Sequence, residues 1–413
     1  MRVLFLTSRF PYPPVGGDRN RVLNFIQALA RAGHEVHLVT FDTAFSRPAG
    51  SILPLTQSVA SMRVVRLPKI LSAARALAGL AGTLPLQAAY YDSSRMRRLV
   101  KEALERIRPD LVYTHLFRMA PYALPEMRAY PAAWVLDLTD VVSSEIFRSL
   151  EYRAGLNRWI YREEGRRIER YERQIASLFD RCWVVGSREA KVLAAMAPSA
   201  RIDVVPIGVD GNGAVANGSG SAPGNTAREP ATILFFGFQR IFHNRDAARF
   251  LARDVFPIVR RAVPHAVLEI AGKSSGSLRD VRGEGIRNLG YLEDPRAAFA
   301  RATLFAAPHR FAAGVQTKVL QALDAGLPVV TTPVVREGFD PIPQDLLLEG
   351  RSAEEIAARI VRLIREPALA AEIGARGREW VRSRYRWEDA VLAFEAAAGQ
   401  ARSTAIAVPL TTP

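Results

Sequence analysis

The sequence is poor in cysteine, in long apolar runs and in acidic residues. Cys182 is its single cysteine, so no disulfide can form within the chain, which suits a reducing compartment. We expect Cys182, inside the apolar run RCWVV, to be a buried strand residue. No uninterrupted apolar run approaches the length of a membrane span, and the start MRVLFLT is typical of a strand rather than of a secretory signal. We therefore expect a cytoplasmic protein that is neither secreted nor membrane-spanning.

The shortage of acidic residues leaves a formal net charge of +15. Residues 1–210 carry 30 Lys and Arg against 20 Asp and Glu, whereas residues 211–413 carry 26 against 21, so the excess lies mainly in the first half. A basic surface attracts phosphates, anionic lipids and nucleic acids alike, so charge alone selects no partner. With 413 residues, 49% of them hydrophobic, the chain is long enough for two or three domains with substantial cores.

One stretch in the second half predicts an anion-binding site. Residues 309–332, HRFAAGVQTKVLQALDAGLPVVTT, read as a loop, a short helix that opens at about Gly314 to Thr317 and ends at Gly326, and then a strand. The backbone N–H groups of the first turn and the helix dipole both favour a negative ligand, most naturally a diphosphate. Lys318 and Gln321 share one face of this helix. The alternative is an ordinary buried helix with a glycine entry and a solvated lysine.

This stretch resembles the nucleotide-sugar signature of the retaining glycosyltransferases of family 4, close to a bacterial exopolysaccharide branch with the pattern G-[IV]-Q-N-K-x-L-E-A-M-A. The positions that match as they stand are Gly314, Val315, Gln316, Lys318, Leu320, Ala322 and Pro328. The resemblance implies that the helix start binds the donor diphosphate through Gly314, Val315, Gln316, Thr317 and Lys318. The full family signature has two carboxylates eight residues apart, but this chain has Ala313 and Gln321 there. An amide at 321 is then the expected partner of the donor ribose.

Residues 211–230, GNGAVANGSGSAPGNTAREP, contain few bulky side chains and predict a flexible connection between domains. Each flanking part opens as strand, loop, helix and strand, which is typical of doubly wound sheets. The resemblance implies an α/β chain of two Rossmann-like domains facing a cleft, the GT-B architecture, whose last helix crosses back to the first domain. The expected parts are an acceptor-side domain at 1–210, a linker at 211–230, a nucleotide-sugar-binding domain at 231–385, the crossing helix at 386–400 and a loose tail at 401–413.

The first domain begins with a strand over Val3 to Thr7, a loop rich in Pro and Gly, and a helix over about 18–32 with Asp18 as the expected N-cap. Gly16 and Gly17 fall where doubly wound sheets bind ligands, although such a glycine pair also serves ordinary turns. The family's first loop has the same P-P-x-G-G arrangement beside the donor phosphates and the acceptor. The resemblance therefore implies a binding role for both glycines.

Two further strands of the first domain end in polar residues. His115 ends DLVYTH, and Asp137 and Asp140 lie in AAWVLDLTD. The alternative for a lone strand-end histidine is a structural role, whereas a carboxylate there is able to orient an acceptor hydroxyl and accept its proton. The resemblance implies that all three shape the acceptor side as catalytic residues.

In the second domain, the loop after its first strand contains Gly237 and Arg240. Many relatives have two cations here to neutralise the diphosphate. This sequence has only Arg240 in position, so we expect Lys318 to carry much of that role. The turn GYLED contains Tyr291 and Leu292, where the family lays the nucleobase against the backbone.

Residues 66–108 predict two basic helices, the first mildly hydrophobic. They predict peripheral contact with an anionic membrane, which would be the inner face of the cell membrane. The alternative is two packed helices with solvated arginines. The charged stretch 143–179 suggests a nucleic-acid helix, but Glu163, Glu164, Glu169 and Glu172 interrupt its positive field. We therefore expect no nucleic-acid partner.

These features together predict a retaining glycosyltransferase that moves a sugar from a nucleoside-diphosphate sugar, with UDP expected first, to a hydroxyl acceptor. The residues expected to act are His115, Asp137, Asp140, Lys318 and Arg240. Preorganised charge at the helix start would stabilise the leaving diphosphate, and we expect no cofactor and no metal. The alternatives are a weakly active or inactive relative that binds nucleotide sugar and regulates a partner, and, more remotely, a nucleic-acid-binding protein.

Overall fold

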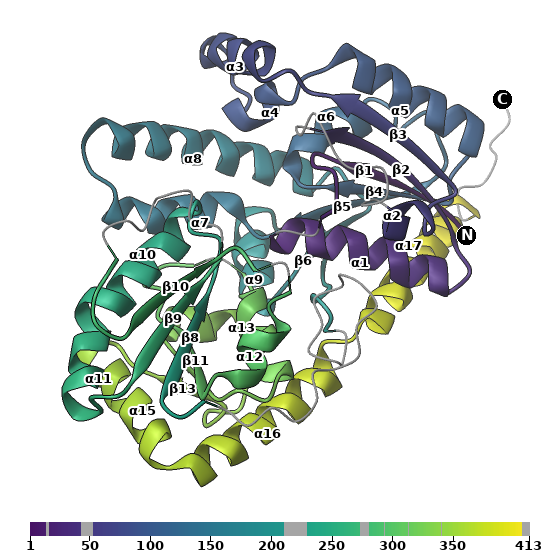
Figure 1. Cartoon of the computed structure of the whole chain (residues 1–413). Helices are drawn as coiled ribbons and strands as arrows, with labels where there is room; N and C mark the ends of the chain where they lie inside the picture. Colours follow the sequence, from purple (N-terminus) through teal and green to yellow (C-terminus); the bar gives the residue numbers. More distant parts are fainter. Residues whose placement is uncertain are drawn as a thin grey trace, which may run out of the picture. The chain divides into compact units, whose positions relative to one another are not determined.

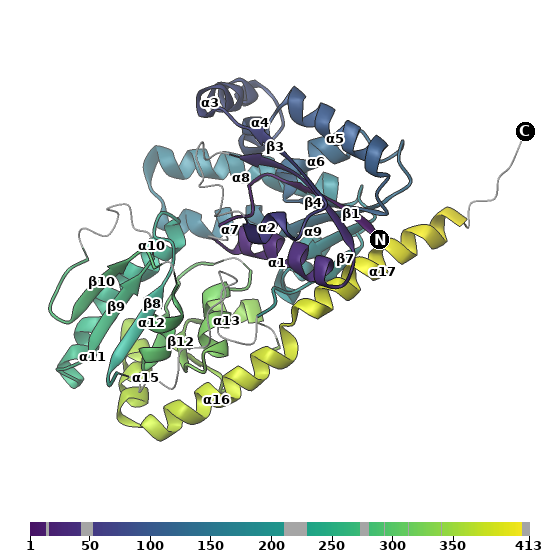
Figure 2. The same ribbon diagram turned by 45° about the vertical axis from the view of Figure 1, so that its right-hand side comes forward.

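The computed structural model describes residues 1–13, 16–42, 53–209, 229–272, 281–292, 294–312, 314–339 and 341–406. The chain divides into two compact units, one made of Met1–Pro206 with Trp387–Pro413 and the other of Ile207–Arg386. In each unit a parallel sheet lies between helices (Figures 1 and 2). The predicted α/β class with two Rossmann-like domains is confirmed.

The first unit is built on a seven-stranded parallel sheet in the order β3-β2-β1-β4-β5-β6-β7. Its strands are β1 (Arg2–Thr7), β2 (Glu35–Asp42), β3 (Ser61–Arg66), β4 (Leu111–His115), β5 (Ala133–Thr139), β6 (Arg181–Val184) and β7 (Ile202–Val204). The strand order reverses direction between β1 and β4, and open α/β sheets bind ligands at the carboxyl edge of such a point. Cys182 is buried in β6, as expected.

Helices cover both faces of this sheet. They are α1 (Gly17–Arg31), α2 (Leu53–Thr56), α3 (Lys69–Ala78), α4 (Leu86–Tyr90), α5 (Ser94–Ile107), α6 (Ala120–Ala123), α7 (Val142–Ser149), α8 (Gly155–Ala176), α9 (Ser187–Met196) and α17 (Trp387–Ile406). Leu4 and Leu6 face the core shared with α5 and α8, while Phe5 contacts Phe394 of α17 on the opposite face. Alternate strand residues therefore supply two separate cores.

The second unit is built on a six-stranded parallel sheet in the order β10-β9-β8-β11-β12-β13. Its strands are β8 (Thr232–Phe236), β9 (Val267–Ala271), β10 (Ile286–Gly290), β11 (Leu304–Ala307), β12 (Val329–Thr331) and β13 (Leu347–Glu349). Its helices are α10 (Phe242–Phe250), α11 (Phe256–Ala262), α12 (Arg296–Arg301), α13 (Thr317–Asp324), α14 (Pro333–Arg336), α15 (Ala353–Arg365) and α16 (Pro367–Arg384), and a π-helical turn over Leu251–Val255 joins α10 to α11.

Several local expectations differ from the structure. Gly16, not Asp18, is the N-cap of α1, because the Asp18 carboxylate pairs with Arg9 at 2.9 Å. The last helix, predicted to end at residue 400, continues to Ile406, and residues 407–413 of the predicted loose tail lie outside the described residues. Most of the expected linker lies outside the described residues.

The two basic helices predicted within 66–108 differ in their packing. α5 buries its apolar stripe, including Met96, Val100 and Leu104, so it is an ordinary surface helix with solvated arginines. In α3 only Ser72 is buried, and Ile70 and Leu77 are exposed. None of the helices in the described ranges combines the length and apolarity needed to cross a bilayer.

Candidate functional site

The predicted anion site lies at the start of α13, on the carboxyl edge of the second sheet. Gly314 has a left-handed backbone (φ 55°), and Gln316 precedes the first helical residue, Thr317. The Lys318 ammonium donates to the Thr317 hydroxyl at 3.1 Å, which holds its charge at the first turn. The positive end of the helix dipole and a cation therefore coincide.

Close backbone packing fixes the position of α13. A Cβ on Gly374 of α16 would overlap the Gly326 carbonyl oxygen, so only glycine permits this approach. The buried Asp324 carboxylate accepts from Arg382 Nε at 2.6 Å. Helix α16 thus holds the C-terminal end of α13 in place, which helps to fix the position of the anion site at the start of α13.

A second tight contact joins the loops that follow β8 and β9. Gly272 has φ 122°, and a Cβ there would overlap the Gly237 carbonyl oxygen. The Gly237 N–H donates to the Ala271 carbonyl at 3.0 Å, and Gln239 Nε2 donates to the same carbonyl at 3.1 Å. Gly237 therefore holds a rigid backbone at the strand end, which is what a close ligand approach requires.

His309 connects this loop to the entrance of α13. Its Nε2 lies 3.1 Å from Asn244 Oδ1, while Asn244 Nδ2 donates to the Phe238 carbonyl at 3.2 Å, so Nε2 carries the proton and donates. Burial, reinforced by His243 and the Lys318 ammonium, lowers the pKa of His309 to about 3. The ring is neutral, and its buried Nδ1 lone pair has no partner within the described ranges.

Gln321 lies one turn after Lys318. Its side-chain oxygen Oε1 is buried and finds no hydrogen-bond donor in the described part of the protein. A buried acceptor without a partner is costly unless a ligand satisfies it. The orphaned oxygen lies where the sequence predicted contact with a ribose hydroxyl. Ala313, the other departure from the family signature, lies outside the described residues.

The other donor residues predicted in the second unit lie at the same edge, whereas Gly16 and Gly17, also predicted to bind the donor, belong to the first unit. Val315 is buried. Arg240 follows β8 and is exposed, and Tyr291, 53% exposed, follows β10 together with the partly buried Leu292. The Gly272 N–H donates to the Gly290 carbonyl at 2.7 Å, which places the end of β10 beside the end of β9. The structure therefore brings these residues to one edge of one sheet.

The acceptor-side prediction concerns the carboxyl edge of the first sheet. Here two non-glycine residues have left-handed φ values: Leu116 (φ 66°, ψ 152°) and Thr139 (φ 63°). The Leu116 N–H donates to the Asp137 carbonyl at 2.7 Å, and the Thr139 hydroxyl lies 3.5 Å from His115 Nε2. Such strain persists only where surrounding contacts enforce it, and it concentrates at functional sites.

His115 is buried at this strained edge. Burial lowers its pKa to about 4, against the opposing effect of Asp137 and Asp18. Its Nδ1 atom is buried and lacks a partner among the residues that the structure describes. The neutral ring is therefore able to exchange a hydrogen bond with a ligand at Nδ1.

Asp137 has a different role from the predicted one. Its carboxylate is fully buried and accepts from Arg21 Nε at 2.6 Å, Tyr113 Oη at 2.5 Å and the Thr139 N–H at 2.8 Å. Arg21 also donates to the Val205 carbonyl at 2.7 Å. With its oxygens engaged in the core, Asp137 positions β5 and is not a general base that contacts a substrate. Arg21 was missed because an arginine in DRNRVLNF suggests a solvated helix face.

Asp140 follows β5 and is partly exposed. Burial, together with the nearby carboxylates of Glu189 and Glu145, raises the pKa of Asp140 well above its ordinary value. The carboxyl group at the strand exit is therefore biased toward its protonated form and is able to donate a hydrogen bond.

The loop before α1 carries a compact charged group. Arg9 Nη1 pairs with Asp18, and a Cβ on Gly16 (φ 100°) would come within 3.0 Å of Asp18 Oδ1. Gly17 is the first residue of α1. The Arg118 guanidinium lies 5.8 Å from the Tyr91 ring, and its Nε has no hydrogen-bond partner in the described ranges. Burial and the neighbouring Arg9 lower the pKa of Arg118. With two arginines and one aspartate, the group carries a formal excess of positive charge.

Two family models match the chain in sequence. The Glycosyl transferase 4-like domain matches residues 16–208, and Glycosyl transferases group 1 matches residues 230–366. Each match falls on one of the two sheets described above. None of the curated protein sequences compared with the chain matches it.

Solved structures share the fold over nearly the whole chain. Sucrose-phosphate synthase from Thermosynechococcus elongatus has a TM-score of 0.69 at 17% identity, over 98% of this chain and 100% of that one. TarM has a TM-score of 0.70 at 12% identity, over 96% and 99%. HepE from Anabaena, in complex with UDP-glucose, has a TM-score of 0.62 at 14% identity, over 99% and 100%. These similarities establish the GT-B architecture.

Proposed function

Because the chain belongs to the glycosyltransferases, with a domain of that family matched in each half, we propose that it moves a sugar from a nucleoside-diphosphate sugar to a hydroxyl acceptor with retention of configuration. The observation that carries the proposal is the start of α13. A helix dipole, the Lys318 ammonium and the unsatisfied oxygen of Gln321 lie there within two turns. These groups suit a diphosphate followed by a ribose.

The chemistry follows from where charge develops. As the bond from the sugar to the diphosphate breaks, negative charge accumulates on the leaving β-phosphate. Lys318 and the N–H groups of the first turn stabilise that charge before the reaction starts, so little reorganisation is needed. The exposed Arg240 is free to turn toward the same phosphate. His309 is neutral, so it contributes no charge to this stabilisation, and its Nδ1 lone pair is able to accept a hydrogen bond.

Acceptor chemistry is assigned to the strained edge of the first sheet. His115 Nδ1 and the Asp140 carboxyl group, whose pKa is raised, are the groups there that exchange hydrogen bonds with a hydroxyl. Asp137 acts through Arg21 and Thr139 as a positioning residue. UDP is the first donor to test, since the HepE structure holds UDP-glucose.

The test is donor-dependent stabilisation and sugar release. UDP-, GDP-, ADP- and dTDP-sugars are added in a thermal-shift series, because a ligand of the native state raises Tm by mass action. We expect one class to raise Tm by several degrees, and Lys318→Ala to remove that rise and lower turnover about 100-fold or more. Lys101→Ala, on the exposed face of α5, is the matched control. An unchanged turnover in Lys318→Ala would refute the mechanism.

Gln321 stands where the family signature has a carboxylate. This difference favours a second candidate function, in which the protein binds a nucleotide sugar and regulates a partner without transferring the sugar. An amide offers the ribose one neutral acceptor where a carboxylate offers two charged ones. Donor stabilisation without any hydrolysis or transfer, for every acceptor class tried, would support this candidate over the enzyme.

A further inference from the structure

Exposed apolar side chains gather on one part of the first unit. Of the fourteen large hydrophobic residues that are exposed in the described ranges, nine lie in two short segments. They are Ile70, Leu71, Leu77, Leu80 and Leu84 in and after α3, and Leu156, Trp159, Ile160 and Tyr161 in the first two turns of α8. Ile70 is 89% exposed and Trp159 is 65% exposed. We call these nine residues the α3/α8 surface.

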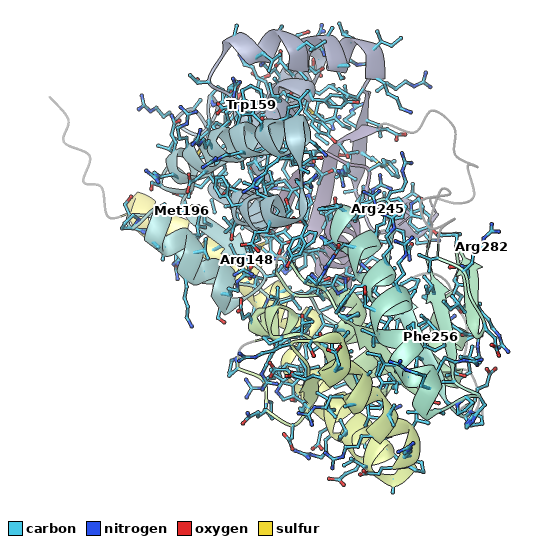
Figure 3. The ribbon with its side chains drawn as sticks, turned by 90° about the vertical axis from the view of Figure 1, so that its left-hand side faces the viewer. Arg148, Trp159, Met196, Arg245, Phe256 and Arg282 are labelled. Carbon is cyan, nitrogen blue, oxygen red and sulfur yellow. The ribbon has the colours of Figure 1, made fainter. Side chains whose placement is uncertain are left out.

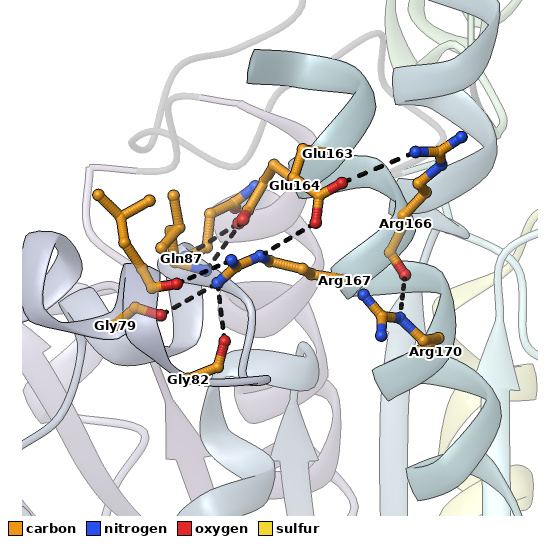
Figure 4. Close-up of polar contacts among 10 residues, drawn as sticks. Gly79, Gly82, Gln87, Glu163, Glu164, Arg166, Arg167 and Arg170 are labelled. Atoms are coloured by element: carbon orange, nitrogen blue, oxygen red, sulfur yellow. Dashed lines mark hydrogen bonds and ion pairs between the residues drawn. The ribbon is translucent and has the colours of Figure 1, made fainter. Parts of the chain in front are cut away.

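The two segments are fixed to each other. Arg167 of α8 donates to the carbonyls of Gly79, Leu80 and Gly82 at 3.0 Å each. The Glu164 carboxylate accepts from the Leu86 and Gln87 N–H groups at 3.0 and 3.1 Å. Figure 4 shows this clamp. The clamp lies one to two turns after Ile160, so it fixes the exposed start of α8 and the segment after α3 in one part of the first unit.

The start of α8 extends beyond the core of its unit. Residues 154–162 are all exposed, although Ile168, Tyr171 and Ile175 further along the helix are buried. Trp159 lies in this outer part of α8 (Figure 3). Leu156, Trp159 and Ile160 recur at spacings of three and four, so they share one face. The feature is an apolar projection, which fits a deformable layer better than a preformed protein groove.

The charged residues within the two segments are all basic, and the acidic residues Glu151 and Glu163 only border the second one. Residues 67–91 and 152–162 contain no Asp or Glu, while Lys69, Arg158 and Arg162 are exposed among the apolar groups. Tryptophan with aliphatic side chains, flanked by cations, is the composition that enters the interface of an anionic bilayer. We propose that the α3/α8 surface docks this protein on anionic lipid.

The proposed lipid-binding surface differs from the range 66–108 that the sequence predicted. Helix α5, which lies within 66–108, is excluded because its apolar stripe is buried. The first two turns of α8, which lie outside that range, supply the exposed tryptophan. The proposal is independent of the transfer reaction, so either one is able to fail without the other.

Vesicle binding tests the proposal on the full chain. Phosphatidylcholine vesicles with and without about one-third phosphatidylglycerol are titrated at two salt concentrations, and bound protein is measured by co-sedimentation. Tryptophan fluorescence gives a second readout. Of the five tryptophans, Trp134, Trp183 and Trp387 are buried, Trp380 is partly buried and Trp159 is exposed. A blue shift on binding therefore reports chiefly on Trp159.

Two pairs of variants and two controls locate the contact. Ile70→Ser with Leu77→Ser keeps the Trp159 reporter, and we expect it to weaken binding at least tenfold. Arg158→Gln with Arg162→Gln is expected to weaken binding about 25-fold at low salt, since each cation near the surface contributes about fivefold. Leu178→Ser with Leu392→Ser and Arg95→Gln with Arg98→Gln alter exposed residues elsewhere and are expected to leave binding and Tm unchanged.

The proposal is supported if the unmodified protein binds anionic vesicles with a blue shift. Both paired variants of the α3/α8 surface must then bind more weakly, and both control pairs must bind as the unmodified protein does. Three results overturn it. They are no binding to anionic vesicles, equal weakening by the Arg95 and Arg98 pair, and a change of oligomeric state in the surface variants without any change in lipid binding, which would assign the surface to a second copy.

Discussion

Arg21 Nε lies 2.6 Å from Asp137 Oδ2, and both side chains are fully buried. The pair joins the first helix to the middle of the sheet, and Arg21 stacks over Phe25 at 4.5 Å. Asp137 in turn accepts from the N–H of Thr139, whose φ is positive. The ion pair thus helps to enforce the strained strand end beside His115.

Breaking this pair should destabilise the first unit strongly. Asp137→Ala leaves a buried guanidinium without its counter-charge, and we expect a loss of about 3–5 kcal/mol in urea unfolding. Arg362→Ala breaks the exposed pair between Arg362 and Glu366, for which less than about 0.5 kcal/mol is expected. An equal loss of unfolding free energy in the two variants would show that burial does not determine how much each ion pair contributes to stability.

Gly272 should tolerate no side chain. Gly272→Ala places a Cβ against the Gly237 carbonyl at a left-handed φ, so we expect a loss of about 2–4 kcal/mol and weaker donor binding. Gly399 is the control, because it lies within α17 and a Cβ added there would meet open space. Gly399→Ala is expected to be neutral or to gain up to about 1 kcal/mol in thermal unfolding. A harmless Gly272→Ala would show that the two loops are not locked together.

His115 should make stability depend on pH on the acid side. Its folded pKa of about 4 lies below the unfolded value near 6.5, so the unfolded chain binds the proton more tightly. The contribution of the neutral ring is complete above about pH 6.5 and is lost as the pH falls toward 4, by up to about 3 kcal/mol. His115→Gln should flatten the urea-unfolding profile between pH 4 and 6.5, whereas His265→Gln, at an exposed position, should not.

Asp140 should separate stability from activity. Because its folded pKa is raised, its ionisation weakens the fold as the pH rises above the unfolded value near 3.9. Asp140→Asn should therefore raise Tm at pH 7 and lower sugar transfer, since the amide is a weaker donor to an acceptor hydroxyl. A higher Tm with unchanged transfer would show that Asp140 does not contact the acceptor. It would still support the raised pKa of this carboxyl group.

Gln321→Glu tests the departure from the family signature. A carboxylate supplies two charged acceptors to a ribose, so we expect donor affinity to rise about tenfold. The same change buries a charge where Oε1 now lies, so the Tm of the free protein should fall. Gln321→Leu should lower both affinity and turnover. Equal donor affinity in all three proteins, measured by calorimetry, would show that position 321 does not contact the donor.

Local pattern predicted most of the fold. Buried-type strands, such as VLFLT and AAWVL, and the glycine that ends the helix at 326 are readable because apolar runs and left-handed backbone are properties of a few neighbouring residues. The donor edge followed from the same logic, since parallel strands bring their carboxyl ends together.

The features that sequence did not reveal depend on distant partners. Arg21 occupies the stripe that Phe25 and Leu29 continue toward the core, which was the available signal, but its partner Asp137 is 116 residues away. The apolar side of α3 was compatible with membrane contact and with packing against a neighbouring helix, because its own segment does not show whether a neighbour covers it. Asp18 is of a residue type that favours the N-cap, but it pairs instead with Arg9, nine residues earlier in the chain.

The aromatic contacts of α17 have a consequence for synthesis. Phe394 packs on Phe5, Phe25, Tyr113 and Trp183, so the first unit lacks part of its interior until α17, which follows the entire second unit, has been translated. During translation of the entire second unit, that aromatic face of the first unit stays exposed and is able to aggregate with other nascent proteins. A stop codon before Trp387 would thus damage the beginning of the protein more than its end.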